Sequence, residues 1–301
     1  MKITSLSALR RGLLLAVLFG TFAAAQPPPA TSVLAGGPLT YAAQWGDSLT
    51  SVAARFGLGV PALAELNGIK PTARLELGQQ LRIENPHLVP FTLDDGIVIN
   101  IPQRMLFYFK SGKLEAAYPA AVGRRTWRTP QGDFEVLEKQ KNKTWIVPVS
   151  IQKEMMRKGL PVQEKVPPGP DNPLGQHWIR ISPSAGIHGT NAPASIYKFQ
   201  THGCIRLLPE NIATLFDEVT VGTPIKIIYE PVLLARLPDG NYYLEVHPDI
   251  YREADDPLAT VKKMAEATGA DSMIDWQEVH KAIRERRGLA ENVSLPPAGN
   301  P

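Results

Sequence analysis

The chain carries its single cysteine in the stretch Thr201-His202-Gly203-Cys204-Ile205-Arg206-Leu207. One cysteine cannot form a disulfide within the chain, so this thiol is a buried inert side chain, half of an intermolecular bridge, or a nucleophile. A thiol has an ordinary pKa of about 8.5 and attacks as the thiolate, so a nucleophilic cysteine needs a nearby base. The neighbours of Cys204 therefore decide among the three interpretations.

Two histidines could serve as that base. His202 lies two residues before Cys204, and in an extended segment such side chains point the same way without their functional groups meeting well. His188 lies 16 positions earlier, in Ile187-His188-Gly189-Thr190-Asn191, which is far enough for a loop to return the imidazole to the sulfur. Gly203 permits close backbone approach, so amides near Cys204 can face a developing oxyanion. The residues favour a Cys204/His188 nucleophilic site.

Each of these residues also has a simpler interpretation. A histidine near a cysteine can be a buried side chain with satisfied hydrogen bonds, and two histidines with one cysteine can ligate zinc. The chain has no C-x-x-C or H-E-x-x-H pattern, so we expect no metal and no cofactor.

Composition and charge narrow the class of protein. The 301 residues are 44% apolar and 20% charged, as in a globular protein with room for two or three domains. The formal net charge is +3, and three bases lie in residues 1–25, which contain no acid. The rest of the chain therefore has equal numbers of acids and bases, which argues against a nucleic-acid partner.

The first 25 residues are typical of a signal peptide. Lys2, Arg10 and Arg11 precede an apolar run that starts with residues 12–19 and continues toward the cleavage site, and Ala23-Ala24-Ala25 supplies small residues for cleavage after Ala25. The apolar run of about 14 residues is shorter than the roughly 20 that span a bilayer. We expect an exported protein, periplasmic or associated with the cell wall, without stable membrane insertion.

The remaining chain divides into segments of different pattern. Residues 26–40 are rich in proline, alanine and glycine and predict a flexible leader, and residues 85–96 predict a linker. Residues 41–84 predict a strand, two helices and a strand. Residues 97–230 predict many short strands and one helix beginning at Pro209. Residues 231–301 predict a β-hairpin, two helices and a disordered end from Ser294. The fold class is α+β with several domains.

The N-terminal unit resembles a known module over its whole length. The residues that carry the resemblance are Tyr41, Gly46-Asp47-Ser48-Leu49, Val52-Ala53, Phe56-Gly57, Leu63, Leu66-Asn67-Gly68, Leu77-Gly78-Gln79, Leu81 and Ile83. Together they resemble a LysM module of βααβ fold. The resemblance implies binding to glycans that contain N-acetylglucosamine, with the loops after Gly46 and around Asn67 as the places for sugar contacts. Most of the matching residues are core, cap or turn positions.

Residues 97–230 resemble the catalytic domain of the L,D-transpeptidases of YkuD type. The resemblance rests on the two stretches around His188 and Cys204, with support from Thr129-Pro130, Gly132 and Phe134, and from residues 167–175. It implies a mostly-β, sandwich-like domain. The order of LysM module, catalytic domain and C-terminal extension resembles the ErfK/YbiS subgroup of periplasmic enzymes.

The resemblance implies a role for each residue of the two stretches. Cys204 would be the nucleophile, and His188 its base and later its acid, oriented by the carbonyl of Gly189. Amides near His202, Gly203 and Cys204 would form the oxyanion hole, and Thr201 would support His202. Thr201, Thr190, Asn191 and Arg206 would contact substrate. Arg206 would pair with a substrate carboxylate, or instead form an ion pair with a neighbouring loop.

The implied reaction is acyl transfer on peptidoglycan stem peptides in cell wall biogenesis. Cys204 would form a thioester with a tetrapeptide stem and release D-alanine. An amine would then accept the acyl group, giving a 3→3 cross-link or anchoring a wall protein. The LysM module would hold the glycan strand, and carbapenems would acylate Cys204. The alternatives are a cysteine L,D-carboxypeptidase that trims stems with water, and a non-catalytic wall-binding protein. A glycan hydrolase is disfavoured because no carboxylate pair lies in a recognisable motif.

Overall fold

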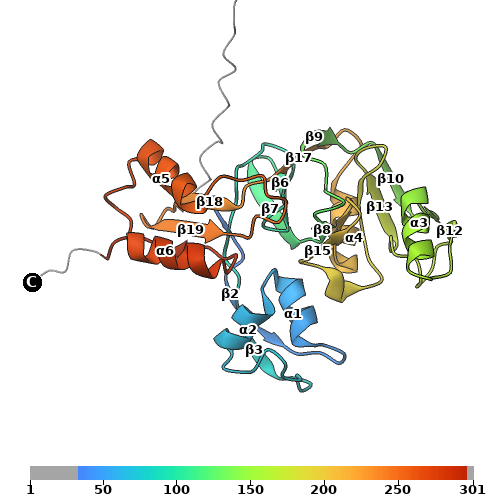
Figure 1. The fold of residues 1–301 in the computed structure, drawn as a ribbon, viewed down its shortest axis with the longest axis horizontal. Coiled ribbons are helices and arrows are strands. Elements are labelled where there is room, and N and C mark those ends of the chain that lie inside the picture. The colour runs from blue at the N-terminus through green and yellow to red at the C-terminus, as the bar shows by residue number, and fades with distance from the viewer. Residues whose placement is uncertain (1–32, 297–301) are drawn as a thin grey trace, which may run out of the picture.

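A computed structural model describes residues 33–296 of the chain, which form three joined units (Figure 1). The expected signal peptide, residues 1–25, lies outside the described residues. The units are an N-terminal module, a central domain built around two sheets, and a C-terminal extension of strands and helices.

The N-terminal module has the expected βααβ order. It consists of β2 (Pro38–Ala42), α1 (Leu49–Phe56), α2 (Val60–Leu66) and β3 (Gln80–Glu84), with β2 antiparallel to β3. Ser48 caps α1 in a reciprocal capping box with Ser51, and Gly57 ends the helix in the left-handed conformation at φ 69°. Among the described residues no single helix is long and apolar enough to cross a membrane; α1 and α2 reach that length only as a pair bent by 100°.

Parts of the expected leader and linker form strands. Residues 34–35 form β1 (Leu34–Ala35), which pairs with β4 (His87–Leu88) from the expected linker, and β2 begins at Pro38 instead of Tyr41. His87, Leu88 and Val89 are fully buried. Both segments have little helical or strand pattern of their own, and they become ordered because each pairs with the other.

The central domain contains a five-stranded and a four-stranded sheet. The first has the order β7 (Lys113–Pro119), β6 (Met105–Lys110), β5 (Gly96–Asn100), β17 (Pro224–Ile228) and β9 (Gly132–Glu135). The second has the order β10 (Glu138–Lys141), β13 (His177–Arg180), β14 (Gly186–His188) and β16 (Ile205–Arg206). Two strand pairs complete it: β8 (Val122–Gly123) with β15 (Phe199–Thr201), and β11 (Trp145–Ile146) with β12 (Lys165–Val166). The helices are α3 (Val149–Arg157), the 3-10 turn η1 (Pro193–Ser195) and α4 (Pro209–Glu218).

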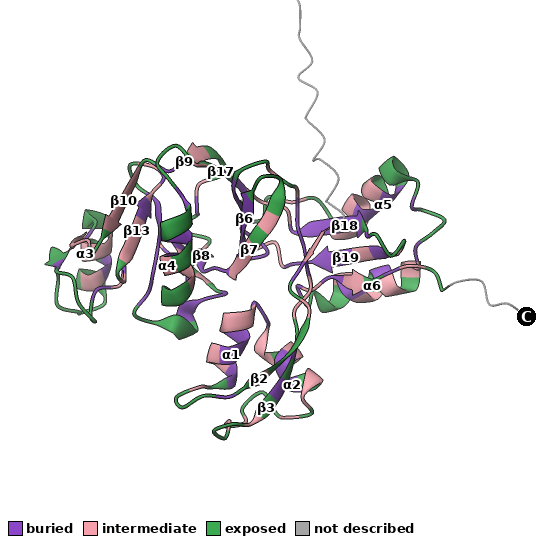
Figure 2. Ribbon diagram, turned by 180° about the vertical axis from the view of Figure 1, so that it is seen from behind, coloured by how far each residue is buried: buried purple, intermediate pink, exposed green. Residues whose placement is uncertain are grey.

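Both sheets share one hydrophobic core, as a sandwich-like domain requires. It joins Ile97 and Ile99 of β5, Ile225 and Ile227 of β17, Ile179 of β13, Ile187 of β14, Ile205 of β16, and Ile212, Leu215 and Phe216 of α4. The central strands therefore read as continuous apolar runs, whereas α3 and α4 present exposed residues to solvent (Figure 2).

The C-terminal extension matches its predicted elements. The hairpin β18 (Val232–Arg236) and β19 (Tyr242–Val246) pairs with β20 (Glu291–Asn292), and α5 (Pro257–Thr268) and α6 (Trp276–Glu285) pack on it. Ser294, where a disordered end was expected to begin, is held in place: its hydroxyl accepts from the amide of Tyr242, and the Leu295 amide donates to the Met273 carbonyl. Residues 297–301 lie outside the described part.

A buried carboxylate joins the C-terminal extension to the central domain and to β4, whose His87 ring also contacts the Gly57 carbonyl of the N-terminal module at 3.2 Å. Glu245 of β19 accepts hydrogen bonds from His87 (2.9 Å), Gln103 (3.0 Å), His247 (2.7 Å) and the amide of Leu88 (2.6 Å), and none of these side chains is appreciably exposed. Burial by itself would raise the pKa of this carboxyl, but the charges and hydrogen bonds of His87 and His247 outweigh burial and lower the pKa to about 2.

Replacing Glu245 with alanine is expected to lower the free energy of unfolding by about 3–5 kcal/mol, because the buried donors of His87, Leu88, Gln103 and His247 lose their acceptor. Urea denaturation of the two proteins measures the difference. Glu266→Ala, an exposed acid on α5, is the control and should stay within about 0.5 kcal/mol of the parent. Equal destabilisation of both variants would contradict a special role for the buried carboxylate.

Candidate active site

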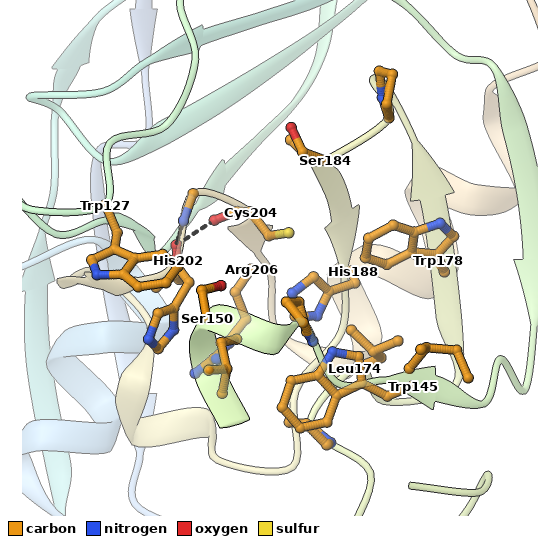
Figure 3. Close-up of a pocket in the computed structure, with 18 of the residues that line it drawn as sticks. Trp127, Trp145, Ser150, Leu174, Trp178, Ser184, His188, His202, Cys204 and Arg206 are labelled. Atoms are coloured by element: carbon orange, nitrogen blue, oxygen red, sulfur yellow. Dashed lines mark hydrogen bonds between the residues drawn. The ribbon is translucent and has the colours of Figure 1, made fainter. Parts of the chain in front are cut away.

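The two sequence stretches meet because their strands are neighbours. β14 ends at His188 and lies between β13 and β16, and it pairs in parallel with β16 so that Ile187 faces Ile205 and His188 faces Arg206. Cys204 occupies the turn just before β16. Figure 3 shows its sulfur pointing to the side of the cavity where His188 and Trp178 lie. The fold thus places a thiol and an imidazole in one cavity.

The cavity has a volume of about 680 Å³ and mixes aromatic walls with a few polar groups. Three of the five tryptophans of the chain line it: Trp127, Trp145 and Trp178. Its polar groups include His188, His202, Cys204 and Arg206. Such a site can bind an amphipathic chain along its walls and fix the orientation with its polar groups. Within residues 33–296, no group of three His, Cys, Asp or Glu side chains is placed to share a metal ion.

His188 is held as a neutral imidazole. Its Nδ1 lies 2.7 Å from the carbonyl oxygen of Gly189, and because a carbonyl only accepts, Nδ1 carries the proton and Nε2 keeps a lone pair. The ring stacks on Trp178 with centroids 5.7 Å apart. Burial, and then the charge of Arg206, lower the pKa of His188 to about 3. The imidazole is therefore unprotonated at neutral pH and can accept a proton.

A tight turn presents Cys204. The hydroxyl of Thr201 donates to the Cys204 carbonyl (2.6 Å) and accepts from the Gly203 amide (3.2 Å). Gly203 has φ 108°, and a side chain there would also press on the Arg128 carbonyl at 3.2 Å, so only glycine fits without strain. The expected bond from Thr201 to His202 is replaced by these two bonds, which close the turn that carries the cysteine.

The thiol is half-buried and protonated in the resting site. Burial raises its pKa, while a backbone hydrogen bond at Gly186 and the charge of Arg206 act in the opposite direction. The Gly203 amide is occupied by Thr201, which removes it from the expected oxyanion hole. In the described part of the chain no acceptor takes the amide of Cys204, so this N–H remains available to an oxyanion.

Arg206 brings a positive charge to the cavity. Its Nη1 donates to the Ser195 hydroxyl at 3.0 Å, its Nε is buried without a partner, and no carboxylate of residues 33–296 pairs with it. The expected alternative, an ion pair with a neighbouring loop, is therefore wrong. An unpaired guanidinium beside a cavity is suited to a carboxylate of a bound ligand.

His202 lies in an ionic cluster that the sequence did not reveal. Its Nε2 is 2.8 Å from the Glu154 carboxylate of α3 and 3.0 Å from the Arg124 guanidinium, so this nitrogen is occupied by the cluster and faces it instead of the thiol. Arg124 and Lys158 also bind Glu154, at 2.6 and 2.7 Å. Hydrogen bonds with Arg124, Lys158 and His202 hold the pKa of Glu154 far below its usual range. The edge of Trp127 meets the His202 ring at 4.5 Å.

Thr190 and Asn191 lie away from Cys204. They line a second cavity of about 480 Å³ on the other side of Gly189, together with Asn172 and His177. The Thr190 hydroxyl accepts from the Ala192 amide at 2.9 Å and thereby shapes the turn after β14. Thr190 and Asn191 thus form part of the turn that follows His188.

Removing the guanidinium in Arg206→Met is expected to raise the pKa of both reacting groups, because the charge stabilises the thiolate and repels the imidazolium. The rate of Cys204 alkylation by iodoacetamide, followed against pH, should rise with a midpoint above the ordinary thiol pKa of about 8.5, and the variant should shift it further upward. Arg236→Met, on the distant hairpin β18–β19, is the control and should leave the profile unchanged. A midpoint in Arg206→Met equal to or below the parent's would contradict this electrostatic picture.

Comparisons with known proteins identify the family and the domains of the chain. The YkuD family model, described as the L,D-transpeptidase catalytic domain, matches residues 94–227, and the LysM domain model matches residues 43–84. "Probable L,D-transpeptidase ErfK/SrfK" of Salmonella typhimurium is 33% identical over 285 residues, which cover 91% of each chain. "Probable L,D-transpeptidase YbiS" of Escherichia coli K12 is 33% identical over 246 residues, covering 79% of this chain and 80% of that one.

A solved L,D-transpeptidase from Mycobacterium smegmatis covers 51% of this chain and 64% of that one at 22% identity, with a TM-score of 0.35 that supports no conclusion by itself. The family models and the curated relatives confirm both resemblances and the α+β multidomain class. The chain therefore belongs to the L,D-transpeptidase family, with a YkuD catalytic domain and a LysM domain.

Proposed function

We propose that the protein is an exported peptidoglycan L,D-transpeptidase that uses Cys204 as its nucleophile in cell wall biogenesis. The observation that carries the proposal is the shared cavity of Cys204, the neutral His188 and the unpaired Arg206. A thiol and a base suit acyl transfer, and a free guanidinium suits a peptide that ends in a carboxylate. A tetrapeptide stem ends in the carboxylate of D-alanine.

The first half-reaction transfers one proton and exchanges one bond. His188 Nε2 takes the proton of Cys204, and the sulfur bonds to the carbonyl carbon of the L centre of the diamino acid. The oxyanion that forms is next to the free Cys204 amide. The carbon–nitrogen bond to D-alanine then breaks, and His188 returns the proton to the leaving amine. A thioester on Cys204 and free D-alanine result.

The second half-reaction regenerates the thiol. An acceptor amine attacks the thioester carbon, gives a proton to His188, and the sulfur leaves and takes that proton back. The diamino acid of another stem gives a 3→3 cross-link, and a lysine of a wall protein gives an anchored protein. Water in place of the amine gives the alternative activity, an L,D-carboxypeptidase that trims stems.

The LysM domain supports the glycan half of the proposal. Trp45 is 92% exposed and Leu77 is 75% exposed, and the two loops that carry them are joined by the bonds of Ala43 with Gly78 and Gln79. An exposed indole on a rigid loop suits stacking against a sugar ring. Asn67 is occupied differently, because its side chain bonds to Leu63 and to both backbone groups of Arg82. It therefore supports the fold, and its amide is not free for a sugar.

The central test incubates the mature protein with disaccharide-tetrapeptide fragments and follows intact mass and released products. The parent should gain a thioester adduct, release D-alanine and yield dimers, and a carbapenem should add to it covalently. Cys204→Ala should give neither adduct. His188→Gln should slow thioester formation by about 10²–10⁴-fold, because the attacking thiol loses its base.

The products separate the alternatives. Tripeptides without dimers indicate the carboxypeptidase, or a protein acceptor absent from the mixture, which added wall protein would reveal. The absence of adduct and product in the parent, with retained binding to peptidoglycan, would indicate a non-catalytic wall-binding protein.

Replacing Trp45 with alanine should weaken binding to insoluble peptidoglycan about fivefold or more, corresponding to roughly 1 kcal/mol of stacking. A pull-down titration measures the apparent Kd. Val221→Ala, an equally isolated exposed apolar residue of the catalytic domain, should bind as the parent does. Unchanged binding in Trp45→Ala would exclude the indole as a sugar contact.

A further inference from the structure

Residues 146–165 form a flap over one side of the cavity. At its base, Trp145 of β11 pairs with Val166 of β12. The chain leaves the domain there, forms α3, and returns through β12. Ile146, Pro148, Ser150 and Ile151 from the flap line the cavity wall. Figure 3 shows Ser150 on the same side of the cavity as His202 and Arg206. The position of the flap therefore sets the width of the cavity.

Away from its base, the flap is hydrogen-bonded to the rest of the described chain at one point. Its other hydrogen bonds are internal, such as Val147 with Glu164 and Gln152 with Val147. Beyond the strand pairing at its base, every hydrogen bond that joins residues 146–165 to the rest of the described chain involves the Glu154 carboxylate, whose partners are Arg124 and His202. A single side chain thus fastens the free end of the flap.

The groups that hold Glu154 belong to the loops around Cys204. His202 is two residues before the nucleophile, and the Arg124 amide donates to the Thr201 carbonyl at 3.1 Å. Arg124 and Lys158 balance the charge of the carboxylate, whose side chain is only 12% exposed. Pairs that are shielded from water and share several hydrogen bonds are stronger than exposed ones. The link joins the cavity wall directly to the turn that presents the thiol.

We propose that Glu154 is a positioning residue of the reaction: by binding His202 and Arg124 it fastens the flap to the Cys204 turn and sets the shape of the cavity for the stem peptide. This proposal rests on the proposed function for the identity of the substrate. The link that Glu154 makes from the flap to His202 and Arg124, here called the latch, does not depend on that function. Substrate binding and attack would both suffer when the latch is lost, since the wall and the turn share it.

The test uses Glu154→Gln, which keeps the size of the side chain but puts an amide donor among donors. The matched control is Glu164→Gln, an exposed acid of the same flap. Three quantities are measured: amide hydrogen exchange in residues 146–165, the melting temperature, and the ratio of Cys204 alkylation rates by a bulky fluorescent maleimide and by iodoacetamide.

Glu154→Gln should speed exchange in the flap about tenfold and raise the bulky-to-small ratio about fivefold or more, with the melting temperature within a few degrees of the parent. Glu164→Gln should match the parent in all three. On tetrapeptide substrate, Glu154→Gln should raise KM and lower kcat. A merely structural role would lower the melting temperature without changing the alkylation ratio.

An alkylation ratio and flap exchange equal to the parent's in Glu154→Gln would overturn the latch. If Glu154→Gln does not fold, Arg124→Gln should give the same changes in a smaller measure, and no change there would also overturn it. A parent protein that is inactive on tetrapeptide while the alkylation ratio still responds would refute the proposed function and leave the latch standing.

Discussion

The parallel pairing of β14 with β16 is the constraint on which the site depends. It sets His188 opposite Arg206. Because Cys204 directly precedes β16, the same pairing fixes the position of Cys204 relative to His188. A shift of one residue would turn the side chains of a strand to the other face of the sheet. The buried isoleucines at positions 187 and 205 prevent that shift, because they must point into the core shared by the two sheets. Core packing and catalytic geometry are thus fixed by the same register.

The charges of the site are distributed unevenly. Its base is neutral, its thiol is protonated, and its guanidinium has no anionic partner among the described residues. The backbone carbonyl of Gly189 orients His188, so the imidazole does not need an acidic side chain to orient it. The unpaired guanidinium of Arg206 is then free to favour an anionic ligand. The same positive charge stabilises the thiolate of Cys204. The Gly189 carbonyl thus orients the imidazole, and the Arg206 guanidinium supplies the charge that attracts a ligand.

The sequence predicted what depends on local chemistry and missed what depends on distant partners. The βααβ order of the N-terminal module, the shared cavity of Cys204 and His188 and the hairpin of the extension follow from neighbouring residues or motifs. The strands β1 and β4 were missed because their partners are distant in the sequence: they pair with each other, and Glu245 binds His87 and the Leu88 amide of β4. Among the residues of α3 only Glu154 is buried, and its role becomes visible only when His202 lies beside it. Thr190 and Asn191 follow His188 in the sequence, but the turn after β14 directs them to the second cavity, away from the cavity that holds Cys204.

The ordered junction between the LysM domain and the catalytic domain has a geometric consequence. Residues 85–96 are no loose tether: His87 and Leu88 are buried, Glu245 binds them, and Arg55 of α1 pairs with Glu210 of α4. A flexible linker would raise the local concentration of stems over a wide radius. A docked module instead gives a fixed span from the glycan to the thiol, so the enzyme would act as a ruler that selects stems at one spacing along the strand.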